Sequence, residues 1–63
     1  MSWNDAKQAA AEWLRELQLP ADLKGQSINV KKLAEKLPQR GAFRDMIVRA
    51  AARQLRQRGA KIE

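Results

Sequence analysis

Residues 42–58 read AFRDMIVRAAARQLRQR, which is the longest helical pattern in the chain. At about 100° of turn per residue, Phe43, Ile47 and Leu55 fall on one side of a helix, with alanines between them. Gly59 follows as a helix-ending residue, because glycine adopts the left-handed conformation there without strain. The stretch therefore predicts a long amphipathic helix whose apolar face packs against the rest of the chain.

The N-terminal stretch, residues 3–18, has the same periodicity. Trp3 and Trp13 lie on one apolar stripe, together with alanines and a leucine spaced three or four residues apart. Ser2 or Asn4 can cap the start of this helix, because a short polar side chain accepts hydrogen bonds from the first free backbone N–H groups. We expect Trp13 to lie in the core and Trp3, in the first turn, to be the more exposed of the two.

A shorter helix is predicted over residues 30–37. Asn29 is suited to be its N-cap, and Val30 and Leu37 lie seven residues apart on one face. The connection that precedes this helix can form one short extra helical turn at residues 20–24.

A chain of 63 residues suffices for one small domain. A fold of about 60 residues buries only about 60% of the surface that its unfolded chain exposes, so the core is marginal. A homodimer or a bound partner would add stability. We therefore expect residues 1–63 to form a single all-α domain, a compact bundle of three main helices at about 3–18, 30–37 and 42–58.

The composition excludes several kinds of chemistry. The chain has no cysteine and no histidine, which removes disulfides and nearly all zinc, haem and iron–sulfur sites. We therefore expect no metal, no cofactor and no catalytic residue, and hence a protein that is not an enzyme. No apolar run approaches the roughly 20 residues of a transmembrane helix, and the N-terminus does not resemble a signal peptide. These features predict a cytoplasmic protein with no membrane partner.

The positive charge is concentrated in the C-terminal part of the chain. Residues 1–39 carry six Lys or Arg and five Asp or Glu, whereas residues 40–63 carry seven and two. Arg49, Arg53 and Arg56 lie within roughly 60° of one another on the long helix, on the side away from its apolar face. Arginine binds phosphate through paired hydrogen bonds and can also read guanine edges. A basic stripe of this kind is typical of a nucleic-acid-binding helix.

This charge pattern predicts a small basic DNA-binding protein, a regulator of transcription or of the DNA transactions of a mobile element. DNA is favoured over RNA as the nucleic acid. The long helix would supply the main contacts, and two lysines of the preceding helix would touch flanking phosphates. The predicted nucleic-acid-binding residues are Arg40, Arg44, Arg49, Arg53, Arg56, Arg58, Lys31 and Lys32.

A second function accounts for the same charge. An acidic surface on a larger protein also requires cations opposite it. The alternative function is therefore a compact helical interaction module, of the kind expected of a phage-type inhibitor or adaptor. Composition alone does not separate this function from DNA binding.

Two stretches in the C-terminal half resemble parts of a known DNA-binding motif. Residues 30–37 read VKKLAEKL, and residues 48–59 read VRAAARQLRQRG. The first resembles the Leu-Ala-Glu-x-Leu helix of GntR-type winged-helix regulators, and the second resembles their Val-Arg-x-Ala-Leu-x-x-Leu-x-x-x-Gly recognition helix. The turn between the two is longer than in that family, and the residues after Gly59 leave no room for a wing. The resemblance implies a helix-turn-helix over residues 30–59 that binds DNA without a wing.

The first helix carries a different resemblance. Residues 11–19 read AEWLRELQL, which resembles the opening helix of sterile alpha motif domains with its Trp-Leu-x-x-Leu-x-Leu pattern. Those domains are small helical modules of protein association that sometimes bind RNA. The middle of this chain is shorter than their usual five helices require. The resemblance implies the second of the two functions, protein association.

The marginal core makes a prediction about assembly. If a second copy or a partner contributes to stability, the midpoint of thermal unfolding rises with protein concentration or with added partner. Circular dichroism melts over a hundredfold dilution series test this. An unchanged midpoint across the series would show that the monomer is stable by itself.

Overall fold

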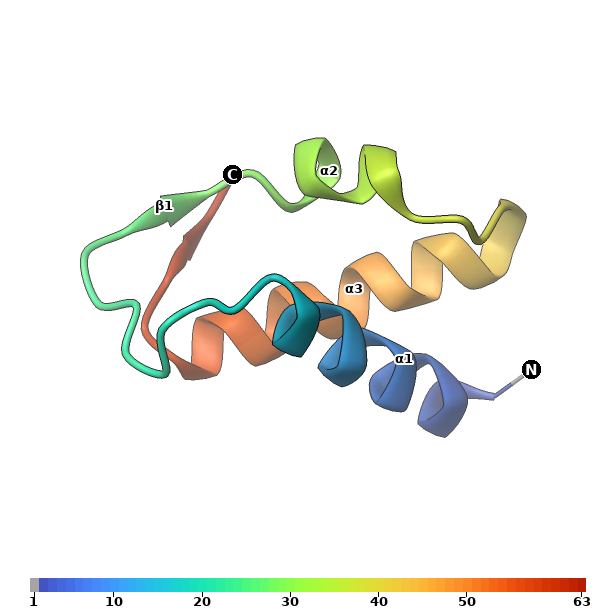
Figure 1. Cartoon of the computed structure of the whole chain (residues 1–63), viewed down its shortest axis with the longest axis horizontal. Coiled ribbons are helices and arrows are strands. Elements are labelled where there is room, and N and C mark those ends of the chain that lie inside the picture. Colours follow the sequence, from blue (N-terminus) through green and yellow to red (C-terminus); the bar gives the residue numbers. More distant parts are fainter. Residues whose placement is uncertain (1) are drawn as a thin grey trace.

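The computed structural model describes residues 2–63 and shows three helices around one core (Figure 1). The predicted all-α bundle is confirmed, and a two-stranded sheet that was not predicted accompanies it. None of the helices within the described residues combines the length and the apolar run that crossing a bilayer requires. The elements are α1 (Trp3–Glu16), β1 (Ser27–Ile28), α2 (Val30–Leu33), the 3-10 turn η1 (Ala34–Lys36), α3 (Gly41–Gln57) and β2 (Lys61–Ile62).

The central element is α3. In Figure 1 it runs between α1 on one side and α2 with η1 on the other, and its most extensive contacts are with α1. Small side chains at a helix contact allow the two backbones to approach closely, and half of the buried core residues are alanines. The buried core consists of Ala6, Ala10, Trp13, Leu14, Leu23, Val30, Ala34, Leu37, Ile47, Ala50, Ala51, Ala52, Leu55 and Ala60.

Side-chain caps start the first two helices. The Ser2 hydroxyl accepts a 3.2 Å hydrogen bond from the Asp5 N–H, and the Asp5 carboxylate accepts one from the Ser2 N–H at 3.1 Å. This reciprocal pair is a capping box, so Ser2 and not Asn4 is the cap. Asn29 caps α2 as predicted, because its Oδ1 accepts the Lys32 N–H at 3.2 Å.

The predicted helix over residues 3–18 extends too far. The last residue of α1 is Glu16, and Gln18 has a φ of 55°, in the left-handed region. That conformation turns the chain out of the helix, while the Gln18 N–H still donates to the Arg15 oxygen at 3.0 Å. The helix therefore ends through its own C-terminal turn before Pro20 can end it.

The helix predicted over residues 30–37 is α-helical only as far as Leu33. It then tightens into η1, and Leu37 is extended with a ψ of 134°. The ring of Pro38 causes this, because the residue before a proline is disfavoured in the α region. The long helix was predicted over 42–58 and spans Gly41–Gln57, a shift of one residue at each end.

The extra helical turn predicted at residues 20–24 does not form. The Asp22 carboxylate accepts the Lys24 N–H at 3.0 Å, which is a local turn and not a helical bond. The Leu23 N–H donates at 2.8 Å to the Arg58 carbonyl oxygen at the end of α3. The connection is therefore held against the C-terminal end of α3, with the Leu23 side chain fully buried.

The last residues of the chain lie alongside β1. β2 pairs in parallel with β1, with Ile28 opposite Ile62. The Lys61 N–H donates to the Gln26 oxygen at 2.8 Å, and the Glu63 N–H donates to the Ile28 oxygen at 3.1 Å. The sheet joins the connection after α1 to the end of the chain and closes one end of the core (Figure 1).

Gly59 directs the chain from α3 into β2. It has a φ of 96°, and the N–H groups of Gly59 and Ala60 donate to the oxygens of Arg56 and Leu55 at 2.9 and 3.1 Å. This is the Schellman pattern, which confirms the predicted helix end at Gly59. A Cβ at this position would lie 3.1 Å from the Lys24 Cα, so glycine is also required by the close approach of that backbone.

Gly59→Ala is expected to destabilise the fold more than Gly25→Ala. Both glycines have positive φ, but a Cβ at Gly25 meets no atom within 4 Å. Gly25→Ala should therefore cost only the backbone strain, on the order of 1 kcal/mol, and Gly59→Ala should cost clearly more than that. Urea denaturation followed by circular dichroism measures both free energies of unfolding. Equal losses would show that the contact with Lys24 is unimportant.

Candidate nucleic-acid interface

Two adjoining hollows lie along one side of α3, where it faces the start of α2 and the end of the chain. Their volumes are about 670 and 500 Å³, and they share Lys31, Val48 and Arg49. We call the two together the basic groove. It is lined by Trp3, Val30, Lys31, Ala34, Gly41, Arg44, Asp45, Val48, Arg49, Ala52, Arg53, Arg56, Ile62 and Glu63.

The rim of the basic groove is strongly cationic. It holds five basic side chains, against the carboxylates of Asp45 and Glu63. Between the cations lie apolar side chains, among them Val48 and Ile62, which are half-buried. The groove therefore offers cations around an apolar surface. Its basic side chains are Lys31, Arg44, Arg49, Arg53 and Arg56.

Arg49, Arg53 and Arg56 lie together as the helical spacing predicts. All three are exposed, and all three line the same hollow. None of their guanidinium groups is hydrogen-bonded to another residue of the described chain. Their donors are therefore free to bind an anionic ligand.

Arg44 lies in the basic groove but serves the fold. Its Nη2 donates a 2.8 Å hydrogen bond to the Ala34 oxygen in η1, and the side chain is half-buried. The same oxygen accepts the Leu37 N–H at 3.0 Å, so Arg44 adds a second, charged hydrogen bond at the end of the α2–η1 helix. Arg44 thus joins η1 to α3 at that end of the groove.

Arg40 and Arg58, the residues that flank α3, bind backbone carbonyls outside the basic groove. Arg40 Nη1 donates to the Leu37 oxygen at 3.0 Å, with longer contacts to the next two carbonyls. Arg58 Nη1 lies 3.5 Å from the Pro20 oxygen. The structure therefore separates both from the cluster at Arg49.

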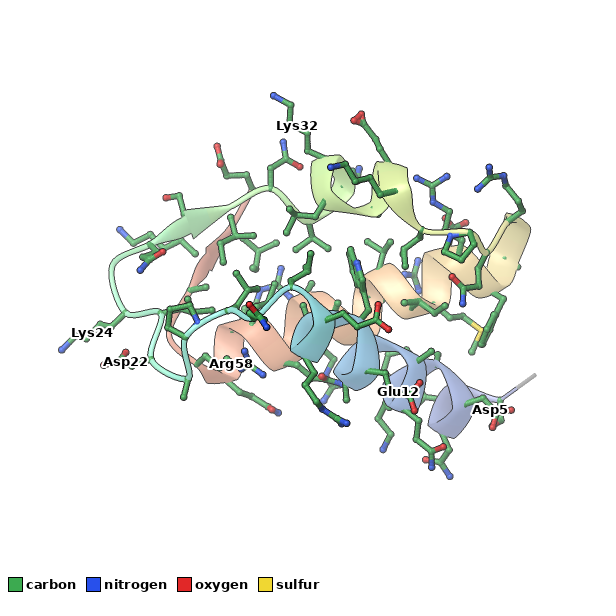
Figure 2. The ribbon with its side chains drawn as sticks, viewed as in Figure 1. Asp5, Glu12, Asp22, Lys24, Lys32 and Arg58 are labelled. Carbon is green, nitrogen blue, oxygen red and sulfur yellow. The ribbon has the colours of Figure 1, made fainter. Side chains whose placement is uncertain are left out.

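Lys31 and Lys32, although adjacent in sequence, lie in different hollows. Lys31 lines both parts of the basic groove, whereas Lys32 lines a separate hollow beside Ile28 and Leu33. Figure 2 shows Lys32 and Arg58 on opposite sides of the molecule. The structure thus brings five of the eight predicted binding residues together and leaves Lys32, Arg40 and Arg58 outside.

Trp3 was not among the predicted binding residues. It is half-buried and lines the basic groove beside Arg53, although it belongs to α1. Its place in the first turn of α1 predicted that it would be the more exposed tryptophan. Trp3 lies beside the arginines because of the way α1 packs on α3. The periodicity of the sequence carries no information about that packing.

Comparisons with known proteins give no relative. No family model matches the chain, and neither a curated protein nor a solved structure matches it. The function is therefore argued from the geometry of the chain itself.

Arg44→Ala is expected to lower the free energy of unfolding, whereas Arg49→Ala is not. Loss of the charged hydrogen bond to the Ala34 oxygen should cost about 1.5 kcal/mol. Removal of the exposed Arg49 side chain should change stability by no more than about 0.5 kcal/mol. Urea denaturation compares the two variants. A stable Arg44→Ala protein would show that this arginine is free for binding.

Proposed function

We propose that the protein is a small DNA-binding protein, a regulator of transcription or of the DNA transactions of a mobile element. The observation that carries the proposal is the exposed cluster of Arg49, Arg53 and Arg56 on one face of α3. Phosphate contacts supply most of the affinity of proteins for DNA. Arginine suits this role because its planar fork binds two oxygens at once.

The arrangement of the helices supports DNA as the ligand. α2 with η1 is followed by the four residues Leu37–Arg40 and then by α3, with the arginine face of α3 pointing away from the core. In a helix-turn-helix the second helix lies in the major groove and carries the base contacts. We propose this role for α3, in line with the resemblance of residues 30–59 to GntR-type regulators.

The proposal divides the basic residues by role. Arg49, Arg53 and Arg56 contact the DNA directly, and Lys31 binds a flanking phosphate from the opposite rim of the groove. Arg44 holds η1 in place and adds positive charge to the site. We propose a cytoplasmic location, where such a protein would meet DNA.

The apolar part of the groove favours a second candidate function. Val30, Val48 and Ile62 lie among the cations, and a wholly electrostatic phosphate site does not require them. An acidic helix of a larger protein, with its own apolar face, would use both features of the groove. In that function the chain is an interaction module and the same arginines face carboxylates.

Arg53→Ala is expected to weaken DNA binding for all duplex sequences and to reduce its salt dependence. Each lost phosphate contact lowers the slope of log affinity against log salt by about 0.9. Fluorescence anisotropy with a labelled duplex, from about 50 to 200 mM NaCl, measures the slope. Arg15→Ala is the matched control, because it removes the same charge from an exposed site on α1 outside the basic groove.

Two results would contradict DNA binding through this face. One is the absence of any anisotropy change with micromolar protein at low salt. The other is an equal loss of DNA affinity in Arg53→Ala and Arg15→Ala, which would show that only the total charge of the protein matters. If the interaction module is correct, Arg53→Ala instead weakens binding to an acidic protein, and DNA binding does not distinguish the two variants.

A further inference from the structure

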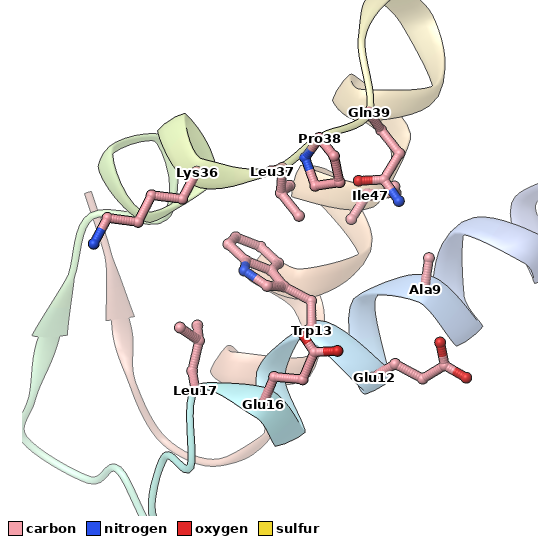
Figure 3. Close-up of a pocket in the computed structure, with 10 residues that line it drawn as sticks. All are labelled: Ala9, Glu12, Trp13, Glu16, Leu17, Lys36, Leu37, Pro38, Gln39 and Ile47. Atoms are coloured by element: carbon pink, nitrogen blue, oxygen red, sulfur yellow. The ribbon is translucent and has the colours of Figure 1, made fainter.

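A second groove lies between α1 and the segment that joins η1 to α3. Its volume is about 420 Å³, and it shares no residue with the basic groove. We call it the Trp13 groove. Figure 3 shows Trp13 between two walls, one from α1 and the other from the segment around Pro38. Its lining residues are Ala9, Glu12, Trp13, Glu16, Leu17, Lys36, Leu37, Pro38, Gln39 and Ile47.

The Trp13 groove exposes one large hydrophobic side chain. Leu17, the C-cap residue that follows α1, is 37% exposed. Beneath it lie Trp13, Leu37 and Ile47, which are buried in the core. A protein with a marginal core gains stability when such a surface is covered.

The two walls of the Trp13 groove carry opposite charge. Glu12 and Glu16 project from the α1 wall, and Lys36 projects from the other wall (Figure 3). The chain as a whole has a net charge of +6, so most of its surface repels a second copy. The lining of the Trp13 groove holds two carboxylates and one ammonium group, so this part of the surface does not repel a second copy of the chain.

The second wall also holds a polar atom without a partner. Within residues 2–63, Gln39 Oε1 is buried and accepts no hydrogen bond. The second wall therefore holds an unsatisfied acceptor in the single copy.

We propose that the Trp13 groove is the interface of a homodimer. A two-fold axis that runs along the groove places the α1 wall of each copy against the second wall of the other. Lys36 of one copy then meets Glu16 of the other, and the contact occurs twice. The exposed Leu17 of each copy is covered by the opposite wall.

A second copy fits this groove better than an unrelated partner of one charge. An acidic partner would be repelled by Glu12 and Glu16, and a basic partner would be repelled by Lys36. A surface that carries both signs on two facing walls is complementary to itself. A stable interface buries about 800 Å² on each partner, roughly one-sixth of the 4595 Å² surface of this chain. The arginines of the basic groove remain free in such a dimer, because they line a different groove.

Charge exchange tests the dimer directly. Glu16→Lys and Lys36→Glu each set like charges against one another in the homodimer, so each variant alone should associate about tenfold more weakly than the wild type. An equimolar mixture of the two restores both opposite-charge pairs in a heterodimer. Sedimentation velocity over a hundredfold concentration range should therefore show dimer in the wild type, a monomer–dimer midpoint about tenfold higher in each variant, and the wild-type midpoint again in the mixture.

Two controls separate the groove from a general effect of charge. Glu35→Lys and Lys32→Glu make the same charge changes at exposed positions outside the Trp13 groove, and both should dimerise like the wild type. Circular dichroism confirms that every variant is folded. A wild type that stays monomeric over the whole range would overturn the proposal. The proposal would also be overturned if the Glu16 and Lys36 variants dimerised as strongly as the wild type, or if the mixture of the two variants did not dimerise more strongly than each variant alone. DNA binding is a separate measurement, and its outcome does not alter these results.

Discussion

The close packing of α1 on α3 determines where the other elements of this fold can lie. Ala6 and Ala10 of α1 and Ala50 and Ala51 of α3 are almost completely buried, and their small side chains bring the two backbones near one another. The Gln54 side chain spans the contact and donates to the Lys7 carbonyl oxygen at 3.1 Å. With one side of α3 committed to this contact, its arginines must lie on the side that faces solvent. A larger side chain at any of the four alanines would separate the helices and remove Trp3 from its place beside Arg53.

The two grooves follow from the same packing and differ in character. The basic groove lies where α3 faces α2 and β2. Its arginines all belong to α3, so the spacing along one helix is enough to align them. The Trp13 groove lies where α1 faces the segment around Pro38, and its opposite charges come from separate parts of the chain. A chain of this size has little surface on which two partners can bind at separate places. Separate faces for nucleic acid and for a second copy would allow both interactions at once, with two basic grooves presented by each dimer.

The sequence predicted what depends on local periodicity and missed what depends on contacts between distant segments. The three helices, the caps at Asn29 and Gly59 and the grouping of Arg49 with Arg53 and Arg56 follow from spacing along the chain, and the structure confirms them. The strand pair was missed because two residues in each strand are too few to show alternation. Arg44 was predicted to bind nucleic acid, yet at about 100° per residue it falls on the same side as Ile47, so its inward position could have been found. The position of Trp3 beside the arginines could not have been predicted from the sequence, because it depends on the angle at which α1 crosses α3.

The most direct test of the account is a nuclear magnetic resonance titration of the labelled protein with duplex DNA. The chain has two indole N–H groups, one at the basic groove and one at the Trp13 groove, so each reports on its own face. Binding through the arginine face predicts shifts of the Trp3 indole, of Lys31 and of residues 48–56, while the Trp13 indole and residues 36–39 stay unchanged. Shifts centred on Trp13 and residues 36–39, or no shifts in excess DNA, would contradict the claim that the outer face of α3 binds nucleic acid.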